Sequence, residues 1–205
     1  MRSIIDVCTR TVRFSALIFA ILTFFGCATM ANRPLTNVYT HPDIKTIKIH
    51  DIAVITFTNA SNTKKDISAS VTKQFITEFN KRGWYVLHEI DKADLEVPEK
   101  IARIDAVLTG TILEYRDYEP LRFGVKLVLK DLTTGETIWS VQEVFDASRH
   151  SVIADVKSYY DTYVSQTNPV KELFEANIYM GYKLYLISMN KFTEFCFNKI
   201  VDTLR

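Results

Sequence analysis

The chain has 205 residues, of which 47% are hydrophobic and 24% are charged, and its formal net charge is +1. This composition is typical of a globular domain and argues against a highly charged disordered chain. The near-neutral balance also argues against the strongly basic surface of nucleic acid-binding proteins, so no nucleic acid partner is expected.

The first 26 residues have the order of a secretory signal. Arg2, Arg10 and Arg13 precede the apolar run ALIFAILTFF (residues 16–25), and the small residue Gly26 follows. As a helix, these ten residues would reach about 15 Å, whereas the hydrocarbon core of a bilayer is about 30 Å thick. The sequence therefore predicts a signal peptide over residues 1–26. The alternative is an uncleaved anchor, because residues 14–32 carry no charge.

The end of this segment resembles a bacterial lipoprotein signal, in which a small residue precedes a cysteine that becomes the lipid-bearing N-terminus. Gly26 and Cys27 match this pattern, while Phe24 and Phe25 stand where the family usually has leucine and a small residue. The resemblance implies lipid attachment, palmitate included, at Cys27. Because Ala28 is not aspartate, it also implies export to the periplasmic face of the outer membrane. Several acyl chains would hold a domain there, since one chain binds only marginally.

Residues 27–50 are expected to form the lipidated N-terminus and a tether. They contain Pro34 and Pro42 and show little periodicity. An edge strand near Ile44–Ile49 is a compatible alternative.

From residue 51 to residue 205 we expect one α+β domain. Residues 51–59 form an apolar, β-branched run typical of a buried strand. Asp66 can cap the following helix, and Gly83 can end it. A second strand is expected at residues 84–90, and a short helix from Pro98. The apolar stripe of the first helix recurs at helical spacing, at Ile67, Val71, Phe75, Ile76 and Phe79.

The block from residue 106 to residue 148 predicts three strands. In RFGVKLVLKD (residues 122–131), apolar and polar residues alternate, and TTGE (residues 133–136) is a turn signal before TIWSVQEVF (residues 137–145). One buried face and one solvent-exposed face are typical of an antiparallel sheet. We therefore predict a two-layer sandwich: a mainly antiparallel sheet of about four to five strands with helices packed on one face.

Residues 148–180 are expected to be a helical addition rich in aromatic residues. Tyr159, Tyr160, Tyr163 and Tyr179 are candidates for an interaction surface, because tyrosine combines a large apolar body with a polar tip. The alternative is that these rings pack the added helices against the sheet. In the last helix, Cys196 lies on the core-facing stripe and is expected to be a buried thiol.

The sequence shows no catalytic motif, so no enzyme, cofactor or metal site is expected. The glycines are not spaced for a phosphate loop, and His41, His50, His88 and His150 are isolated in the sequence. One alternative remains: a ligand-binding or hydrolytic domain that uses an acidic and tyrosine-rich patch at residues 114–119.

Three short motifs resemble the CsgG/LpoB-like group of bacterial envelope lipoproteins, which serve in curli assembly or activate penicillin-binding proteins. They are the opening strand at Ile52–Phe57, the VLTGTI strand at residues 107–112, and the TGE hairpin at Leu129–Trp139. The resemblance implies a non-enzymatic accessory protein that binds envelope proteins or associates with itself, in secretion, polysaccharide export or cell-wall synthesis. An auxiliary lipoprotein of a lipid-transport system is an alternative.

Overall fold

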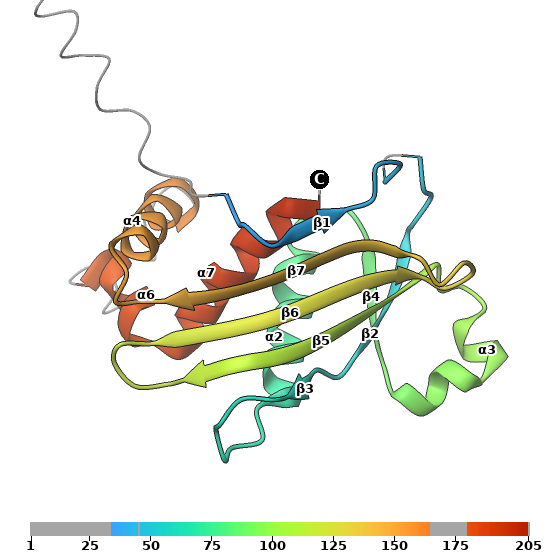
Figure 1. The fold of residues 1–205 in the computed structure, drawn as a ribbon, viewed down its shortest axis with the longest axis horizontal. Coiled ribbons are helices and arrows are strands. Elements are labelled where there is room, and N and C mark those ends of the chain that lie inside the picture. The colour runs from blue at the N-terminus through green and yellow to red at the C-terminus, as the bar shows by residue number, and fades with distance from the viewer. Residues whose placement is uncertain (1–33, 45, 165–179, 205) are drawn as a thin grey trace, which may run out of the picture. The chain divides into compact units, whose positions relative to one another are not determined.

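The computed structural model describes residues 34–44, 46–164 and 180–204. In this part of the chain, a twisted sheet forms one layer, and the long helices α2 (Ser68–Asn80) and α7 (Met189–Val201) cover one of its faces (Figure 1). The seven strands are β1 (Val38–Thr40), β2 (Asp51–Ile55), β3 (Thr58–Asn59), β4 (Val86–Ile90), β5 (Ala106–Arg116), β6 (Arg122–Asp131) and β7 (Thr137–Asp146).

The shorter helical elements lie mostly at the ends of the sheet. They are η1 (Lys92–Glu96), α3 (Pro98–Ile101), α4 (His150–Tyr159), the π-turn η2 (Tyr160–Val164), η3 (Gly181–Lys183), α6 (Leu184–Ile187) and η4 (Asp202–Leu204).

The strand order is β1-β7-β6-β5-β2-β4, and β3 pairs with β5. The pairs β5–β6, β6–β7 and β1–β7 are antiparallel, whereas β2 runs parallel to β4 and β5, and β3 runs parallel to β5. The α+β class is confirmed, but the sheet is larger than predicted and mixed. The reason is that α2 connects β2 to β4 as a crossover, which makes neighbouring strands parallel.

The edge strand β1 lies within the stretch that the sequence predicts as a tether. It pairs with β7 through Val38 opposite Val141 and Tyr39 opposite Ser140. The predicted position near Ile44–Ile49 is wrong, because the described residues there form turns and irregular backbone instead. A three-residue strand is too short to show a period of two.

The residues that the sequence singles out at the ends of α2 flank the helix, but its N-cap residue is Ile67 and not Asp66. The Oδ1 atom of Asp66 accepts a hydrogen bond from the backbone N–H of Ser68 at 3.2 Å, which satisfies a donor of the first turn. After the helix, Gly83 has a φ of +65°, a conformation that glycine adopts without steric strain because it has no Cβ atom. The buried side chains Val71, Phe75 and Phe79 turn the helix toward the sheet.

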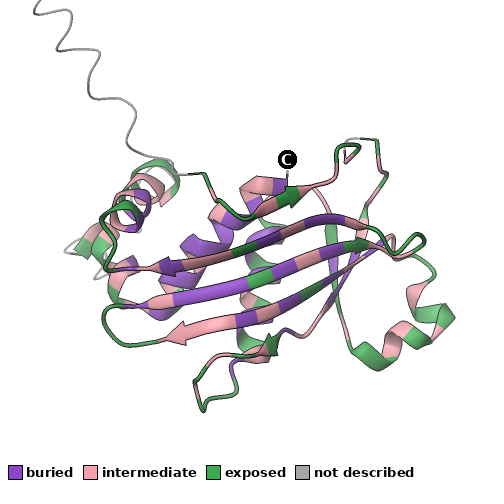
Figure 2. Ribbon diagram, viewed as in Figure 1, coloured by how far each residue is buried: buried purple, intermediate pink, exposed green. Residues whose placement is uncertain are grey.

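The core lies between the sheet and the two long helices. Phe197 of α7 contacts Phe75 of α2 and Phe123 of β6 edge-on, with ring centroids 5.3 Å and 5.2 Å apart. All three rings are fully buried. Figure 2 shows the buried residues along the centre of the sheet and on the sheet-facing side of the helices.

Helix α7 follows the stripe that the sequence predicts. Its buried side chains include Met189, Phe192, Cys196 and Ile200, and Cys196 is a free, fully buried thiol. Burial raises the pKa of this thiol well above its ordinary value, so Cys196 behaves as a small apolar side chain. At the end of the chain, Trp139 of β7 donates a hydrogen bond from Nε1 to Thr203 at 3.1 Å.

Gly110 lies on the core face of β5, and a side chain there would meet Phe57. A Cβ atom at this position would stand 2.4 Å from Cδ1 of the Phe57 ring, which is 1% exposed. We expect Gly110→Ala to lower the free energy of unfolding by about 1–3 kcal/mol, because overpacking forces neighbouring side chains to shift. Urea denaturation measures the change.

The matched control is Thr109→Ala, at the exposed neighbour on the opposite face of β5, which should change stability by no more than about 0.5 kcal/mol. Combining Gly110→Ala with Phe57→Leu should recover part of the loss. An unchanged midpoint for Gly110→Ala alone would contradict this account of the contact.

Candidate functional site

Four of the residues that the sequence singles out lie outside the described residues. They are Gly26, Cys27 and Ala28 of the signal-like segment, and Tyr179. Among the helices that the structure describes, none is long and apolar enough to cross a membrane.

The other three candidate tyrosines lie at the helical end of the molecule, on α4 and η2. Tyr159 packs among the rings of Tyr163, Tyr185 and Phe195, with centroids 5.5 Å, 5.6 Å and 5.7 Å away. Tyr160 faces Tyr185 at 6.2 Å. Tyr159 and Tyr160 are therefore half-buried packing residues, as the alternative interpretation expects, whereas Tyr163 is 47% exposed.

A polar network lies beneath these rings. Glu194 of α7 accepts hydrogen bonds from the hydroxyls of Tyr159 and Tyr185, both at 3.4 Å, and pairs with Lys191 at 3.0 Å. Burial first, and the Glu194 carboxylate second, raise the pKa values of both tyrosines, so both stay neutral phenols. Their hydroxyls serve to hold α4 and α6 against α7.

Two charged contacts fix the elements around this network. Lys199 of α7 pairs with Asp155 of α4, and both side chains are nearly buried. Arg82, just after α2, pairs with Asp202 at 2.7 Å, and its guanidinium lies 5.6 Å from the centre of the Tyr163 ring. Removing one partner of a buried ion pair lowers the free energy of unfolding strongly, because the other charge is left buried and unpaired. These contacts therefore keep α4 and η2 in place.

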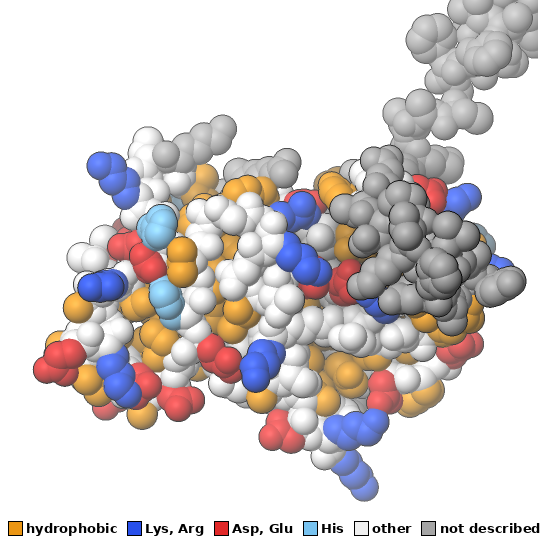
Figure 3. All heavy atoms as spheres, turned by 180° about the vertical axis from the view of Figure 1, so that it is seen from behind, with side chains coloured by type: hydrophobic (Ala, Val, Ile, Leu, Met, Phe, Trp, Pro, Cys, Tyr) orange, Lys and Arg blue, Asp and Glu red, His pale blue; other side chains and the backbone are white. Residues whose placement is uncertain are grey.

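Three exposed apolar side chains surround this end. Tyr163, Met180 and Ile187 are 47%, 39% and 40% exposed, and we call these three residues the aromatic patch. Where its side chains are described, the face seen in Figure 3 carries acidic and basic side chains interspersed. The three exposed side chains of the patch are uncharged, so they offer apolar contact and not charge.

The acidic patch at residues 114–119 is made largely of ion pairs. Glu114 pairs with Arg122 at 3.1 Å, and Asp117 pairs with Lys65, which holds the pKa of Asp117 below its ordinary value. Arg116 lies over the ring of Tyr118 and donates a hydrogen bond to the carbonyl of Pro120. The contacts of Glu114 and Arg116 join the two sides of the β5–β6 hairpin, and the Asp117 pair joins its turn to the segment before α2.

Two histidines that are distant in the sequence meet at one carboxylate. Asp51 interacts with Nε2 of His88 at 2.6 Å and with Nδ1 of His50 at 2.8 Å, and these contacts lower its pKa. The two histidines are isolated in the sequence, and the parallel pairing of β2 and β4 brings both rings to Asp51. Among the described residues, no group of three or more metal-ligating side chains is placed to hold a metal ion.

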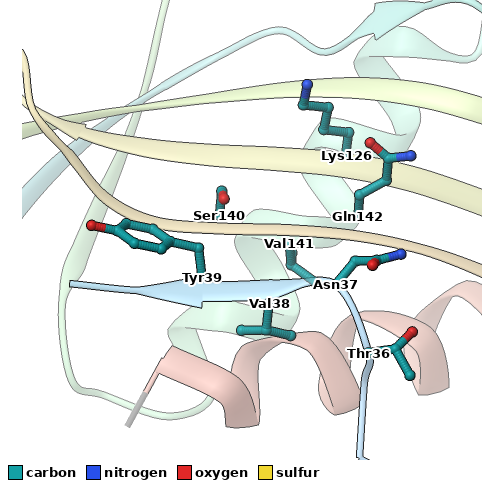
Figure 4. Close-up of a pocket in the computed structure, with 8 residues that line it drawn as sticks. All are labelled: Thr36, Asn37, Val38, Tyr39, Lys126, Ser140, Val141 and Gln142. Atoms are coloured by element: carbon teal, nitrogen blue, oxygen red, sulfur yellow. The ribbon is translucent and has the colours of Figure 1, made fainter. Parts of the chain in front are cut away.

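A half-open groove lies where β1 meets β7, on the side of the sheet away from α2 and α7. Its volume is about 480 Å³. Ser140 forms its floor, with Tyr39 on one side and Gln142 and Lys126 on the other (Figure 4). The remaining lining residues are Thr36, Asn37, Val38 and Val141. The sequence gives no motif for this groove, because its lining comes from three segments that only the β1–β7 pairing brings together.

Comparisons with known proteins give structural likenesses alone. No family model matches the chain, and no curated protein matches its sequence. The PelC dodecamer from Paraburkholderia phytofirmans is similar at 20% identity over 58% of this chain and 86% of that chain, with a TM-score of 0.44. Lipoprotein GNA1162 from Neisseria meningitidis is similar at 20% identity over 47% and 79%, with a TM-score of 0.37.

The LpoB C-terminal domain from Salmonella enterica is 15% identical over 51% of this chain and 93% of that chain, with a TM-score of 0.36. Bacterial lipoproteins, including the LpoB branch that the sequence resembles, are thus among the structures similar to this chain. The likeness to CsgG stays a prediction. At these scores the similarity concerns part of the fold and assigns no activity or partner.

Glu78 of α2 is a deeply buried carboxylate close to the polar network around Glu194. Its side chain is 5% exposed and pairs with Lys81 at 2.6 Å, but its Oε2 atom has no hydrogen-bond partner in the described part of the chain. Burial raises the pKa of Glu78 above its ordinary value of 4.5, and Glu194 adds to this effect, while Lys81 opposes it.

Because its pKa is higher in the folded state, Glu78 gives up its proton at lower pH in the unfolded state. From about pH 4.5 up to the folded pKa, the folded chain binds more protons, so the free energy of unfolding falls as pH rises. We expect Glu78→Gln to remove this fall, as measured by urea denaturation across the window. Glu99→Gln, at an exposed carboxylate, is the control. Equal pH slopes in the two variants would contradict the assignment.

Proposed function

We propose that this chain is an accessory lipoprotein, held by lipid on Cys27 at the periplasmic face of the outer membrane. It acts by binding envelope proteins or copies of itself, in secretion, polysaccharide export or cell-wall synthesis, and not by catalysis. The observation that carries the proposal is the N-terminal sequence: an arginine-bearing start, a short apolar run, and then Gly26 and Cys27.

Two features of the structure support a binding role. Tyr163, Met180 and Ile187 of the aromatic patch are exposed apolar side chains. Aromatic residues and methionine are enriched at protein interfaces, where rigid anchors supply much of the binding energy. The Lys199–Asp155 pair joins the neighbouring helices α4 and α7, and Arg82 contacts the Tyr163 ring, so a partner would meet a preformed surface.

The ion pairs at residues 114–119 support the absence of catalysis at the acidic patch. Glu114 and Asp117 each have a basic partner, and the pKa of Asp117 is lowered and not raised toward neutrality. A general acid or base for work near pH 7 needs a pKa close to that value. The pairing favours a structural role for these carboxylates.

We expect Cys27→Ser to abolish metabolic labelling of the chain by a fatty acid analogue. The hydroxyl of serine does not replace the thiol as the site of lipid transfer, and the chain should leave the membrane fraction or keep its signal segment. Cys8→Ser, at the cysteine before the apolar run, is the control and should label like the original chain. Persistent labelling of the Cys27 variant would refute the lipid anchor.

We expect Tyr163→Ser combined with Ile187→Ser to weaken assembly. Both substitutions remove apolar area from the aromatic patch, which should lower the affinity for a partner or a second copy by about tenfold or more. Crosslinking in cells, followed by native mass spectrometry of the detergent-solubilised chain, measures the change.

The control is Tyr118→Ser, because Tyr118 is 68% exposed on the turn between β5 and β6 and is not part of the aromatic patch. If the chain remains a monomer without partners in all forms, the binding role is wrong. If the Tyr118 variant loses assembly and the patch variant does not, the interaction surface lies at the hairpin.

A further inference from the structure

The lining of the β1–β7 groove is rich in groups that both donate and accept hydrogen bonds. Thr36, Asn37, Ser140 and Gln142 contribute hydroxyls and amides, and Tyr39 adds a phenol. Within the described chain, none of these side chains bonds to another protein group. Their hydrogen-bonding capacity is therefore directed at solvent or at a ligand.

The groove has one charged group, and it is positive. Lys126 is exposed on the outer face of β6 beside Gln142, and it has no ion-pair partner among the described residues. Asp146 stands four positions along β7 from Gln142, and four residues of strand extend about 13 Å, so this carboxylate lies beyond the groove. Glu114 stands opposite Gly124, two positions along β6 from Lys126, and both carboxylates are already paired with Arg122. An anionic group is therefore favoured near Lys126.

The aromatic wall is formed by Tyr39. It lies directly opposite Ser140 in the β1–β7 pairing and is 47% exposed. The small side chain of Ser140 leaves space beside the ring (Figure 4). A pyranose ring has an apolar face of C–H groups and an edge of hydroxyls, so it suits an aromatic wall next to hydroxyls and amides.

We propose that this groove binds a carboxylate-bearing sugar unit of an acidic saccharide. The sugar ring packs on Tyr39, its hydroxyls bond to Asn37, Ser140 and Gln142, and its carboxylate pairs with Lys126 in a charge-assisted contact. The volume of about 480 Å³ is in the usual range for small-ligand sites, about 300–1,000 Å³. Neither the groove nor its ligand depends on the lipid at Cys27.

An extended peptide fits this groove less well. Peptides that add to sheets use the unpaired backbone groups of an edge. The groove opens on the face of the sheet, across β1, β7 and β6, and not along the outer edge of the edge strand β1. A nucleic acid would need several phosphate contacts, and the groove offers a single lysine.

Digalacturonate tests the proposal on the full chain in detergent, with the neutral disaccharide cellobiose as the comparison ligand. Isothermal titration is expected to give a millimolar Kd for digalacturonate and weaker binding for cellobiose. Lys126→Met and Tyr39→Ala should each raise the Kd by about tenfold. Both side chains are exposed, so folding should be unaffected, and circular dichroism checks this.

Lys130→Met is the matched control, because Lys130 is also an exposed lysine on the outer face of β6 but does not line the groove. It should change the Kd by no more than about twofold. Equal losses at Lys126 and Lys130 would show binding to surface charge and overturn the site. No binding at about 10 mM digalacturonate, or equal affinity for cellobiose, would also overturn it. Tetraglutamate bound as tightly, with the same Lys126 dependence, would replace the saccharide with an acidic peptide.

Discussion

The contact on which the rest of the structure depends is the edge-on packing of Phe197 against Phe75 and Phe123. One ring from α7 joins the other long helix to the central strand of the sheet. Loss of a buried phenylalanine side chain typically costs about 3–5 kcal/mol, a large share of the 5–15 kcal/mol that stabilises a domain. Because the long helices cover one face only, the aromatic core lies on this side, and much of the opposite face of the sheet is left to interact with water and ligands.

Much of the core could be predicted from periodicity. The stripe of α2, the alternation in β6 and the stripe of α7 follow the spacing of helices and strands closely, since each element buries one face. The mixed pairing of the sheet was not predictable in this way. Parallel and antiparallel neighbours share the same alternation, and the difference lies in how the chain returns between strands. The strands β1 and β3, with three and two residues, are too short to carry a pattern.

The candidate sites also divide into those that a sequence pattern predicts and those that depend on strand pairing. The burial of Cys196 follows from its position on a helical stripe, and a packing role for Tyr159 was one of two open interpretations. The meeting of His50 and His88 at Asp51, and the groove around Ser140, depend on strand register. A register of one residue more or less would turn every side chain to the other face. Such constellations become visible only when the partner strands are known.

The short strand β1 has a mechanical consequence. It is the first described strand, and it is held to β7 at an edge of the sheet by three residue pairs, next to the backbone bond from Gln142 to Asn37. A pull from the N-terminal side would open this strand before any force reached the core, and each freed residue would lengthen the chain by up to about 3.3–3.6 Å. Since Thr36, Asn37 and Tyr39 leave with it, tension would dismantle the groove, and an occupied groove would resist extension.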